Sequence, residues 1–411
     1  MNLAHLGQRV SSIRRFTALA MALAAAGFAA RFGNASTRLS SAKELVDPQL
    51  VVHEWGTFTS IAGLDGAAAE WLPLSQKNDL PSFVEHLRNA DVKGGLRGTV
   101  RMETPVLYFY SPRQTTVSVT VSFVKGLITE WFPNATLVHP SEAFPITLNS
   151  EINGAIAWQN VTITPTSSDT LPREAAPRHY YAARETSANL LSVPTSSGNQ
   201  IEKFLFYRGV SESTPPVAAK VQANGQLQFQ NNTQAILTVI LFERRGDKLG
   251  YTVSSLQSSA TLNTPSTSGT FDSLRSDFEN ALIAQGLYRD EAHAMLETWR
   301  DSWFEEGSRL FYIVPRPFVD SVLPLSIQPA PSQLTRVFVG RIELVTPATE
   351  NIIEIALLRN DREALQKYGR FLATMVEIIA AKHPDTAQSA RLKQAFADYC
   401  VRLPCSPATR R

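Results

Sequence analysis

The stretch TTVSVTVSFV, residues 115–124, decides the fold class of the first half of the chain. Within it Val117, Val119, Val121 and Phe123 alternate with serine and threonine. Because successive side chains of a β-strand point to opposite faces of the sheet, this alternation predicts a strand with one buried face and one polar face.

Similar runs recur on both sides of this strand, separated by Pro, Gly, Ser and Asn. They are PVLYFYS (105–111), IAWQNVTITP (156–165), KFLFYRGV (203–210) and AILTVILFERR (235–245). The pair Asn224-Gly225 is typical of a tight hairpin turn, so neighbouring strands are expected to run antiparallel. We therefore expect an antiparallel, β-sandwich-like domain over residues 50–260.

The pattern changes after residues 257–270, a small polar stretch that contains Pro265 and Gly269. Helical spacing predicts helices at 271–285 and 290–306, and further helices begin at residues 347, 361 and 385. Strand-like runs at 309–316 and 335–346 lie between them. The chain is therefore expected to be α+β, with an α+β segment over 270–411 whose strands may complete the first sheet.

The N-terminus has the layout of a signal peptide. Arg9, Arg14 and Arg15 precede an apolar run over residues 18–30, and small residues follow up to Ala35. The run is shorter than the roughly 20 residues that a membrane helix needs, so we expect cleavage rather than a permanent membrane anchor. This interpretation makes residues 1–35 a signal peptide, 36–49 a linker, and the protein exported to the periplasm or outside the cell, by a general secretory or a twin-arginine route.

The charge balance argues against nucleic acid as a partner. The full chain has 39 Lys and Arg against 37 Asp and Glu, and residues 1–35 hold four of the Arg and no acid. The mature chain would carry 35 basic and 37 acidic residues, without a basic patch for a phosphate backbone. A hydrophobic fraction of 44% with 18% charged residues indicates a soluble globular protein.

The two cysteines, Cys400 and Cys405, lie close together near the C-terminus. Export would favour a disulfide between them, and a single pair cannot form a cysteine-based zinc site. The sequence also contains no H-E-x-x-H, because Thr57 stands where the second histidine would be, and no G-x-S-x-G or P-loop. It therefore assigns no metal and no cofactor.

The stretch VVHEWGTFTS, residues 51–60, places His53 and Glu54 on opposite faces of an expected strand. Both residues are candidate catalytic groups because a buried histidine or glutamate can transfer protons. The structural alternative is a hydrogen-bonded core histidine and a glutamate that supports the framework.

A second group of candidates combines Tyr and Arg side chains with His179, which is itself a candidate catalytic group. The candidate ligand-binding residues are Tyr180, Tyr181 and Arg184 in RHYYAAR (178–184), Arg208 in EKFLFYRG (202–209), and Arg316. Such residues grip sugars or anions by stacking and forked hydrogen bonds. They also cover strands with their apolar stems in the absence of any ligand.

The helix over 290–306 carries His293, Glu297 and Asp301 at intervals of four residues, and Glu305 extends this face. A solvated face is one explanation. Acids in the last helical turn are disfavoured by roughly 0.3–1 kcal/mol each, so we expect an Arg partner for Glu305 or Glu306, with Arg316 preferred over Arg309. In the functional interpretation Glu305 is an acid–base group at a cleft that His53 or His179 also reaches.

Two functions remain open on these grounds. The first is an exported binding or cell-envelope-associated protein with a small-molecule or glycan ligand. The second is an extracytoplasmic hydrolase that uses paired carboxylates and His on a sugar or ester substrate. A cleft where acids and His from distant segments meet with perturbed pKa values would favour the enzyme, and a shallow aromatic groove would favour the binding protein. The sequence does not indicate an oligomeric state.

Overall fold

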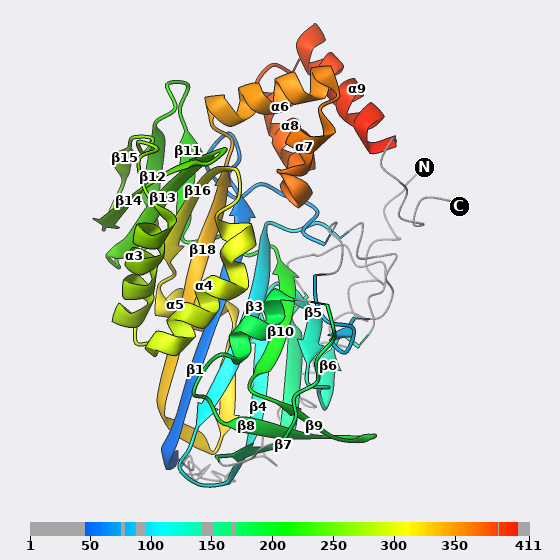
Figure 1. Ribbon diagram of the computed structural model, residues 1–411, viewed down its shortest axis with the longest axis vertical. Coiled ribbons are helices and arrows are strands. Elements are labelled where there is room, and N and C mark those ends of the chain that lie inside the picture. The colour runs from blue at the N-terminus through cyan, green and yellow to red at the C-terminus, as the bar shows by residue number, and fades with distance from the viewer. Residues whose placement is uncertain are drawn as a thin grey trace, which may run out of the picture. The chain divides into compact units, whose positions relative to one another are not determined.

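The structure is a computed structural model that describes residues 46–74, 79–87, 96–141, 152–165, 169–176, 178–384 and 386–401. The expected signal peptide and the linker as far as residue 45 lie outside these residues. Strand β1 (Val46–Ile61) is the first described element and begins ahead of the expected domain start at residue 50. The predicted α+β class is confirmed, with a β-rich body followed by a segment rich in helices (Figure 1).

The largest layer is a nine-stranded sheet that contains strands from both halves of the chain. Its spatial order is β14 (Lys248–Leu256), β13 (Leu237–Arg245), β16 (Gly307–Ile313), β18 (Ala330–Leu344), β1, β3 (Val100–Tyr110), β10 (Leu205–Ser211), β5 (Gly126–Phe132) and β2 (Glu85–His86). Strands β16 and β18 thus complete the first sheet. Strand β1 pairs in parallel with β18 and antiparallel with β3, so this sheet is mixed rather than purely antiparallel.

A second sheet packs against one face of the first. It contains β17 (Leu325–Gln328), β4 (Thr115–Phe123), β7 (Gly154–Thr164), β8 (Leu190–Thr195) and β9 (Gly198–Glu202), with β6 (Leu137–His139) paired to β7. The alternating residues of β4 are buried as the sequence predicts, and they share a core with Leu107 and Phe109 of β3. A small sheet of β11 (Val217–Val221), β12 (Leu227–Asn231) and β15 (Ala260–Leu262) joins the same core.

Helices cover the other face of the nine-stranded sheet (Figure 1). Val106 and Tyr108 of β3 pack there against α3 (Phe271–Ala284), α4 (Arg289–Trp303) and the 3-10 helix η1 (His179–Arg184). Helix α4 ends at Trp303, before the expected position, because Phe304 already leaves the helical conformation, and Gly307, with a φ of 120°, begins β16. Glu305 and Glu306 therefore lie in the turn after the helix.

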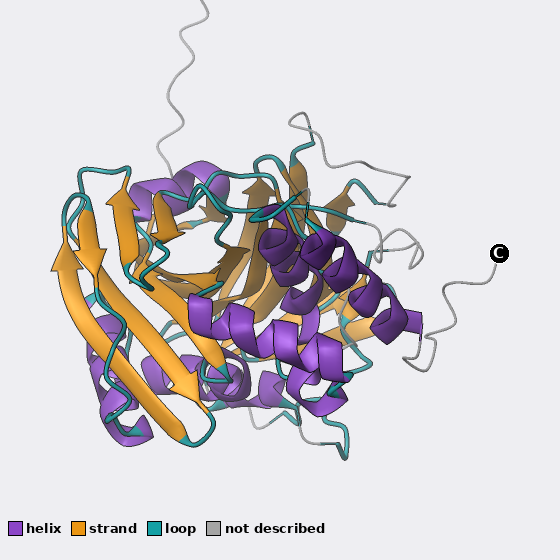
Figure 2. Ribbon diagram, turned by 90° about the horizontal axis from the view of Figure 1, so that it is seen from above, coloured by secondary structure: helices purple, strands orange, loops and turns teal. Residues whose placement is uncertain are grey.

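The C-terminal helices lie over the ends of the strands (Figure 2) and form a third core together with Ile61 of β1, Trp71 and Val345. They are α6 (Pro347–Arg359), α7 (Arg362–Gln366), η2 (Gly369–Phe371), α8 (Leu372–Ala381) and α9 (Ala387–Val401), and the short α5 (Arg316–Val322) precedes β17. The single helix predicted over 361–382 is interrupted, because Gly369 takes a φ of 46° and turns the chain. This turn places Arg370 toward the body of the protein.

One of the two cysteines lies within the described residues. Cys400 at the end of α9 is a free, exposed cysteine and forms no disulfide, whereas Cys405 lies outside the described residues. Among the helices that the structure describes, none has the length and apolar character needed to cross a membrane.

Candidate functional site

Irregular pairing in the middle of the nine-stranded sheet creates the framework of the site. Between Met102 and Val106, β3 carries one more residue than each of its neighbours, β1 and β10. Strand β5 also carries one more residue than β10, beside Arg208. Such bulges bend a strand and redirect its side chains, and here they lie next to one another across the sheet.

Thr104, inside the β3 bulge, has an unusual backbone conformation. Its φ is 48°, a region that β-branched residues rarely adopt, and its side chain is buried. The Thr104 hydroxyl accepts hydrogen bonds from Nε and Nη2 of Arg208, both at 3.2 Å. Conformations of this kind cost on the order of 1–3 kcal/mol and concentrate at functional sites.

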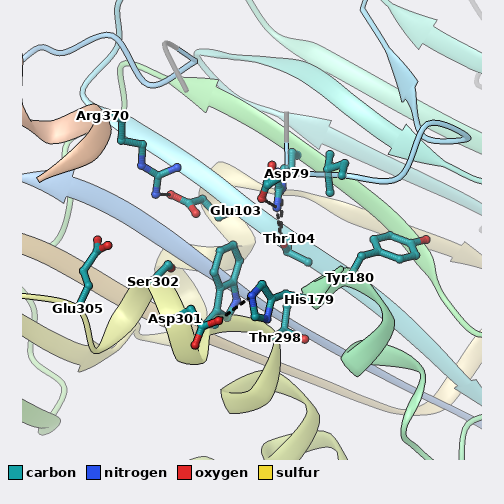
Figure 3. A pocket seen from close by; sticks show the side chains of 13 residues that line it. Asp79, Glu103, Thr104, His179, Tyr180, Thr298, Asp301, Ser302, Glu305 and Arg370 are labelled. Atoms are coloured by element: carbon teal, nitrogen blue, oxygen red, sulfur yellow. Dashed lines mark hydrogen bonds and ion pairs between the residues drawn. The ribbon is translucent and has the colours of Figure 1, made fainter. Parts of the chain in front are cut away.

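A polar cavity of about 220 Å³ opens beside this bulge (Figure 3). It is lined by Asp79, Leu80, Glu103, Thr104, His179, Tyr180, Arg208, Thr298, Trp299, Asp301, Ser302, Glu305 and Arg370. These residues come from the loop before β2, from β3, β10, η1 and η2, and from α4 with the turn that follows it. The cavity therefore brings together acids, a histidine and arginines from distant parts of the chain.

Two carboxylates of the cavity are held in ion pairs with arginine. Arg208 donates to both oxygens of Asp79, at 2.8 and 3.0 Å. Burial alone would raise the pKa of Asp79, but the charge and hydrogen bonds of Arg208, together with the charge of Arg101, outweigh burial and hold that pKa well below its usual range. Arg370 is paired with Glu103, whose burial is likewise outweighed by arginines, so the pKa of Glu103 is lowered. Burial lowers the pKa of Arg370 to about 10 even though Glu103 opposes this effect.

The pKa of Glu305 is shifted in the opposite direction from those of Asp79 and Glu103. Burial raises the pKa of Glu305, and the positive charges of Arg309 and Arg341 do not fully compensate for it. These arginines lie 3.5 and 3.3 Å from its Oε1, and 33% of the side chain remains exposed. The expected Arg partner is present, but the preference for Arg316 over Arg309 is wrong.

His179 and Asp301 form an exposed pair at the cavity. Nε2 of His179 lies 2.9 Å from Oδ2 of Asp301, and the two side chains are 52% and 63% exposed. Figure 3 shows this pair at the end of α4, beside η1. If Nε2 donates to Asp301, Nδ1 of His179 carries the lone pair that can accept a proton.

Two aromatic side chains, Trp299 and Tyr180, also line the cavity. The guanidinium of Arg208 lies 5.9 Å from the centre of the Trp299 ring. The indole Nε1 of Trp299 is buried and has no hydrogen-bond partner among the described residues. Buried donors of this type are normally satisfied, so this N–H is an exception among the polar groups near the cavity.

The structure places His53 away from this cavity. It is completely buried under α4, and its Nδ1 lies 2.8 Å from Oε2 of Glu291. Tyr110 donates to the other oxygen of Glu291, and the ring of Tyr288 lies 4.4 Å from that of His53. This arrangement fixes the start of α4 on the sheet, which agrees with the structural alternative for His53.

Glu54 and Arg316 also lie outside the cavity. Glu54 is buried on the opposite face of β1, where it accepts hydrogen bonds from Arg336 and from Tyr207, each at 2.5 Å. Arg316 is partly exposed at the start of α5 and donates to Asp320 at 2.7 Å.

The RHYYAAR stretch contributes to the cavity only in part. His179 and Tyr180 line it, whereas Arg184 turns away and forms a buried pair with Glu202, at 2.9 Å from Nε to Oε1. Tyr180 donates to the same glutamate at 3.2 Å. Tyr181 is not among the residues that line the cavity, and its hydroxyl accepts a hydrogen bond from the backbone N–H of Glu174. Of the five predicted ligand-binding residues, Tyr180 and Arg208 line the cavity.

Comparison with known proteins assigns no family to the chain. No family model and no curated protein matches it. One solved structure that matches is "Fcho1 Mu homology domain (Danio Rerio) with bound Eps15 peptide", with 9% sequence identity over 72% of this chain and 97% of that domain. Its TM-score of 0.28 is too low to carry an argument about fold or function.

Sequence reasoning missed several residues of the cavity, namely Asp79, Glu103, Thr104 and Arg370. Each depends on the bulge or on a contact between distant segments, and neither leaves a periodic signal in the sequence. Within the described residues no group of three or more His, Cys, Asp or Glu has the arrangement of a metal site.

Proposed function

We propose that this protein is an exported hydrolase that acts on a small sugar or ester substrate in the polar cavity. The observation that carries the proposal is the convergence of Glu305, Asp79 and Glu103 with the His179–Asp301 pair on one cavity, where the surroundings shift the carboxyl pKa values in opposite directions. The pKa of Glu305 is raised by burial, while those of Asp79 and Glu103 are lowered by arginines that outweigh burial. Carboxyl groups whose environments separate their pKa values are the usual basis for assigning acid and base roles.

Glu305 is the proton donor in this proposal. A carboxyl group with a raised pKa retains its proton at higher pH than an ordinary glutamate and can give it to the leaving oxygen of a substrate. Its side chain is partly exposed and lines the cavity, so a substrate oxygen can reach it. The same proton would otherwise have to come from water.

His179 is the proton acceptor, and Asp301 orients it. With Nε2 donating to Asp301, Nδ1 of His179 takes a proton from an attacking water as the water oxygen bonds to the substrate carbon. The carbon–oxygen bond of the leaving group breaks, and Glu305 protonates that oxygen. The proton on His179 then returns to Glu305 through solvent, so protons and charges balance over one turnover.

The lining of the cavity favours a small, uncharged and polar substrate. The volume of about 220 Å³ is below the roughly 300–1,000 Å³ typical of sites for drug-sized ligands. Arg208 and Arg370 are already paired with Asp79 and Glu103, so they leave little charge for an ionic ligand. Hydroxyl groups of Thr104 and Ser302 and the aromatic ring of Trp299 suit a sugar unit or a short polar ester.

The second candidate is an exported binding protein with the same small-molecule or glycan ligand. The paired state of Asp79, Glu103, Arg208 and Arg370 favours it, because a cavity with satisfied charges can hold a ligand without chemical change. Both candidates begin with binding in the cavity, and turnover separates them.

The test uses the mature protein and a panel of methyl glycosides and ethyl esters, whose alkoxide leaving groups need a proton donor. We expect turnover of one class by the wild type, none by Glu305→Gln, and wild-type turnover by Glu306→Gln. Glu306 is the matched control because it lies outside the cavity and accepts from the backbone N–H of Gly246 at 2.9 Å. Calorimetry with the free sugars and alcohols runs in parallel. Binding without turnover would replace the hydrolase with the binding protein, and the absence of both would refute the two candidates.

A further inference from the structure

Behind Glu305 lies a second glutamate that shares its arginine partners. Glu343 of β18 is buried and stands directly opposite Arg309 of β16 in the sheet. Its Oε1 accepts from Nε of Arg309 at 2.8 Å and from Nε of Arg341 at 2.7 Å. The two arginines therefore lie between Glu343, inside the protein, and Glu305, at the cavity.

The arginines bind the two glutamates unequally. Nη2 of Arg341 lies 2.6 Å from Glu343 but 3.3 Å from Glu305. The Nη2 of Arg309 is 3.5 Å from Glu305, and it donates to the backbone oxygen of Glu306 at 2.9 Å. The Glu343 carboxylate thus accepts the short, charge-assisted hydrogen bonds, and the carboxylate of Glu305 has only the contacts of 3.3 and 3.5 Å.

We propose that Glu343 is a positioning residue that lets Glu305 keep its proton, because it holds and neutralises part of the charge of Arg309 and Arg341. This inference rests on the proposed role of Glu305 as proton donor. With Glu343 ionised, the two guanidinium groups present about one net positive charge to Glu305, and without it they would present two.

The surroundings of Glu305 are consistent with this division of roles. The negative charge of Glu343 raises the pKa of Glu305, whereas Arg309, Arg341 and Arg370 lower it, and burial has the largest effect. Two other acids of the cavity lie near Glu305 in the structure or in the sequence. Glu103 is paired with Arg370, and Asp301 precedes Glu305 by one helical turn. Glu343 lies closer to both arginines than Glu305 does, at 2.8 Å from Nε of Arg309 and 2.6 Å from Nη2 of Arg341.

The test measures the titration of Glu305 itself, so it does not need a substrate. Protein labelled with ¹³C at the glutamate carboxyl carbons is titrated by NMR, and the signal of Glu305 is the one absent from Glu305→Gln. We expect Glu343→Gln to shift the titration midpoint to lower pH and Arg341→Gln to shift it to higher pH. The double variant should return it toward the wild-type value, and Glu354→Gln on α6 should leave it unchanged.

A folded Glu343→Gln variant with an unchanged or higher midpoint overturns the proposal. If Glu343→Gln does not fold, Arg341→Gln is compared with the double variant, in which the buried charges are again balanced. The proposal is supported if the titration midpoint of Glu305 is lower in the double variant than in Arg341→Gln, and it is overturned if the two midpoints are equal. A protein without any turnover would refute the hydrolase but leave this result interpretable.

Discussion

Arg370 and Glu103, 267 positions apart in the sequence, form a buried ion pair between the C-terminal helices and the bulge of β3. The Arg370 guanidinium also lies 5.6 Å from the ring centre of Trp71 and 4.9 Å from that of Phe371. One side chain thus connects the third core to the wall of the cavity.

Arg370→Met should destabilise the protein by about 3–5 kcal/mol, because it leaves the Glu103 carboxylate buried without its partner. Chemical denaturation measures this loss. Arg370→Met combined with Glu103→Gln should recover most of it, and Arg359→Met, at the exposed end of α6, serves as the control. Equal stability of the single variant and the wild type would show that Glu103 finds another partner.

Glu305→Gln should be more stable than the wild type near neutral pH and equally stable below about pH 4. A raised pKa means that the folded state disfavours the ionised carboxyl, so the wild type loses stability as pH rises through the unfolded and then the folded pKa. Glutamine removes that ionisation. Thermal unfolding over this pH range provides the measurement, and a variant that is less stable at neutral pH would contradict the raised pKa.

If the protein hydrolyses a substrate, kcat should fall on the alkaline side as Glu305 loses its proton. Because burial raises the pKa of Glu305, the fall should begin above the ordinary glutamate range, which is centred at about 4.3. The pH dependence of kcat, followed with the substrate found in the panel, shows this limb. A rate that stays constant up to mildly alkaline pH would assign proton donation to another group.

Thr104→Asn should leave the free energy of unfolding unchanged or raise it, by at most about 1 kcal/mol. Asparagine tolerates positive φ, and its side-chain oxygen can replace the hydroxyl that accepts from Arg208. Thr104→Val is the contrasting variant. It retains the strained conformation but removes the acceptor, and should cost about 1–3 kcal/mol. Urea denaturation of both variants decides whether the strain or the hydrogen bond dominates.

Export predicts that the mature protein begins near Ser36. N-terminal sequencing of protein from the extracytoplasmic fraction of native cells tests this expectation. An intact Met1 in the cytosol would contradict it.

The local structure followed from the sequence where periodicity or turn chemistry was strong. Val117, Val119, Val121 and Phe123 are buried on one face of a strand, and the turn expected at Asn224-Gly225 joins the antiparallel strands β11 and β12 with Gly225 at a φ of 84°. The break at Gly369 was missed, because a glycine with positive φ interrupts a pattern that side-chain spacing alone would continue. Helix α4 ends at Trp303 rather than 306, because Phe304 already leaves the helical conformation ahead of Gly307.

The candidate site was predictable only where its residues were consecutive or one helical turn apart. His179, Tyr180 and Glu305 were identified in this way, and all three line the cavity. The partner of Glu305 was misjudged because the sequence does not show which arginine turns back toward the end of α4. Strand register instead puts Arg309 beside Glu343, while Arg316 follows the strand and binds Asp320.

The parallel pairing of β1 with β18 also affects how the chain folds. Glu54 on β1 and Arg336 on β18 are 282 positions apart and form a buried ion pair at the centre of the sheet. A ribosome adds about 5–20 residues per second, so roughly 15–55 s pass between the synthesis of β1 and that of β18. Contacts between such distant residues slow folding, because a long loop must close before they form. Until β18 arrives, that edge of β1 is unpaired and can pair with other chains, so a chaperone that shields β1 should raise the yield of folded protein.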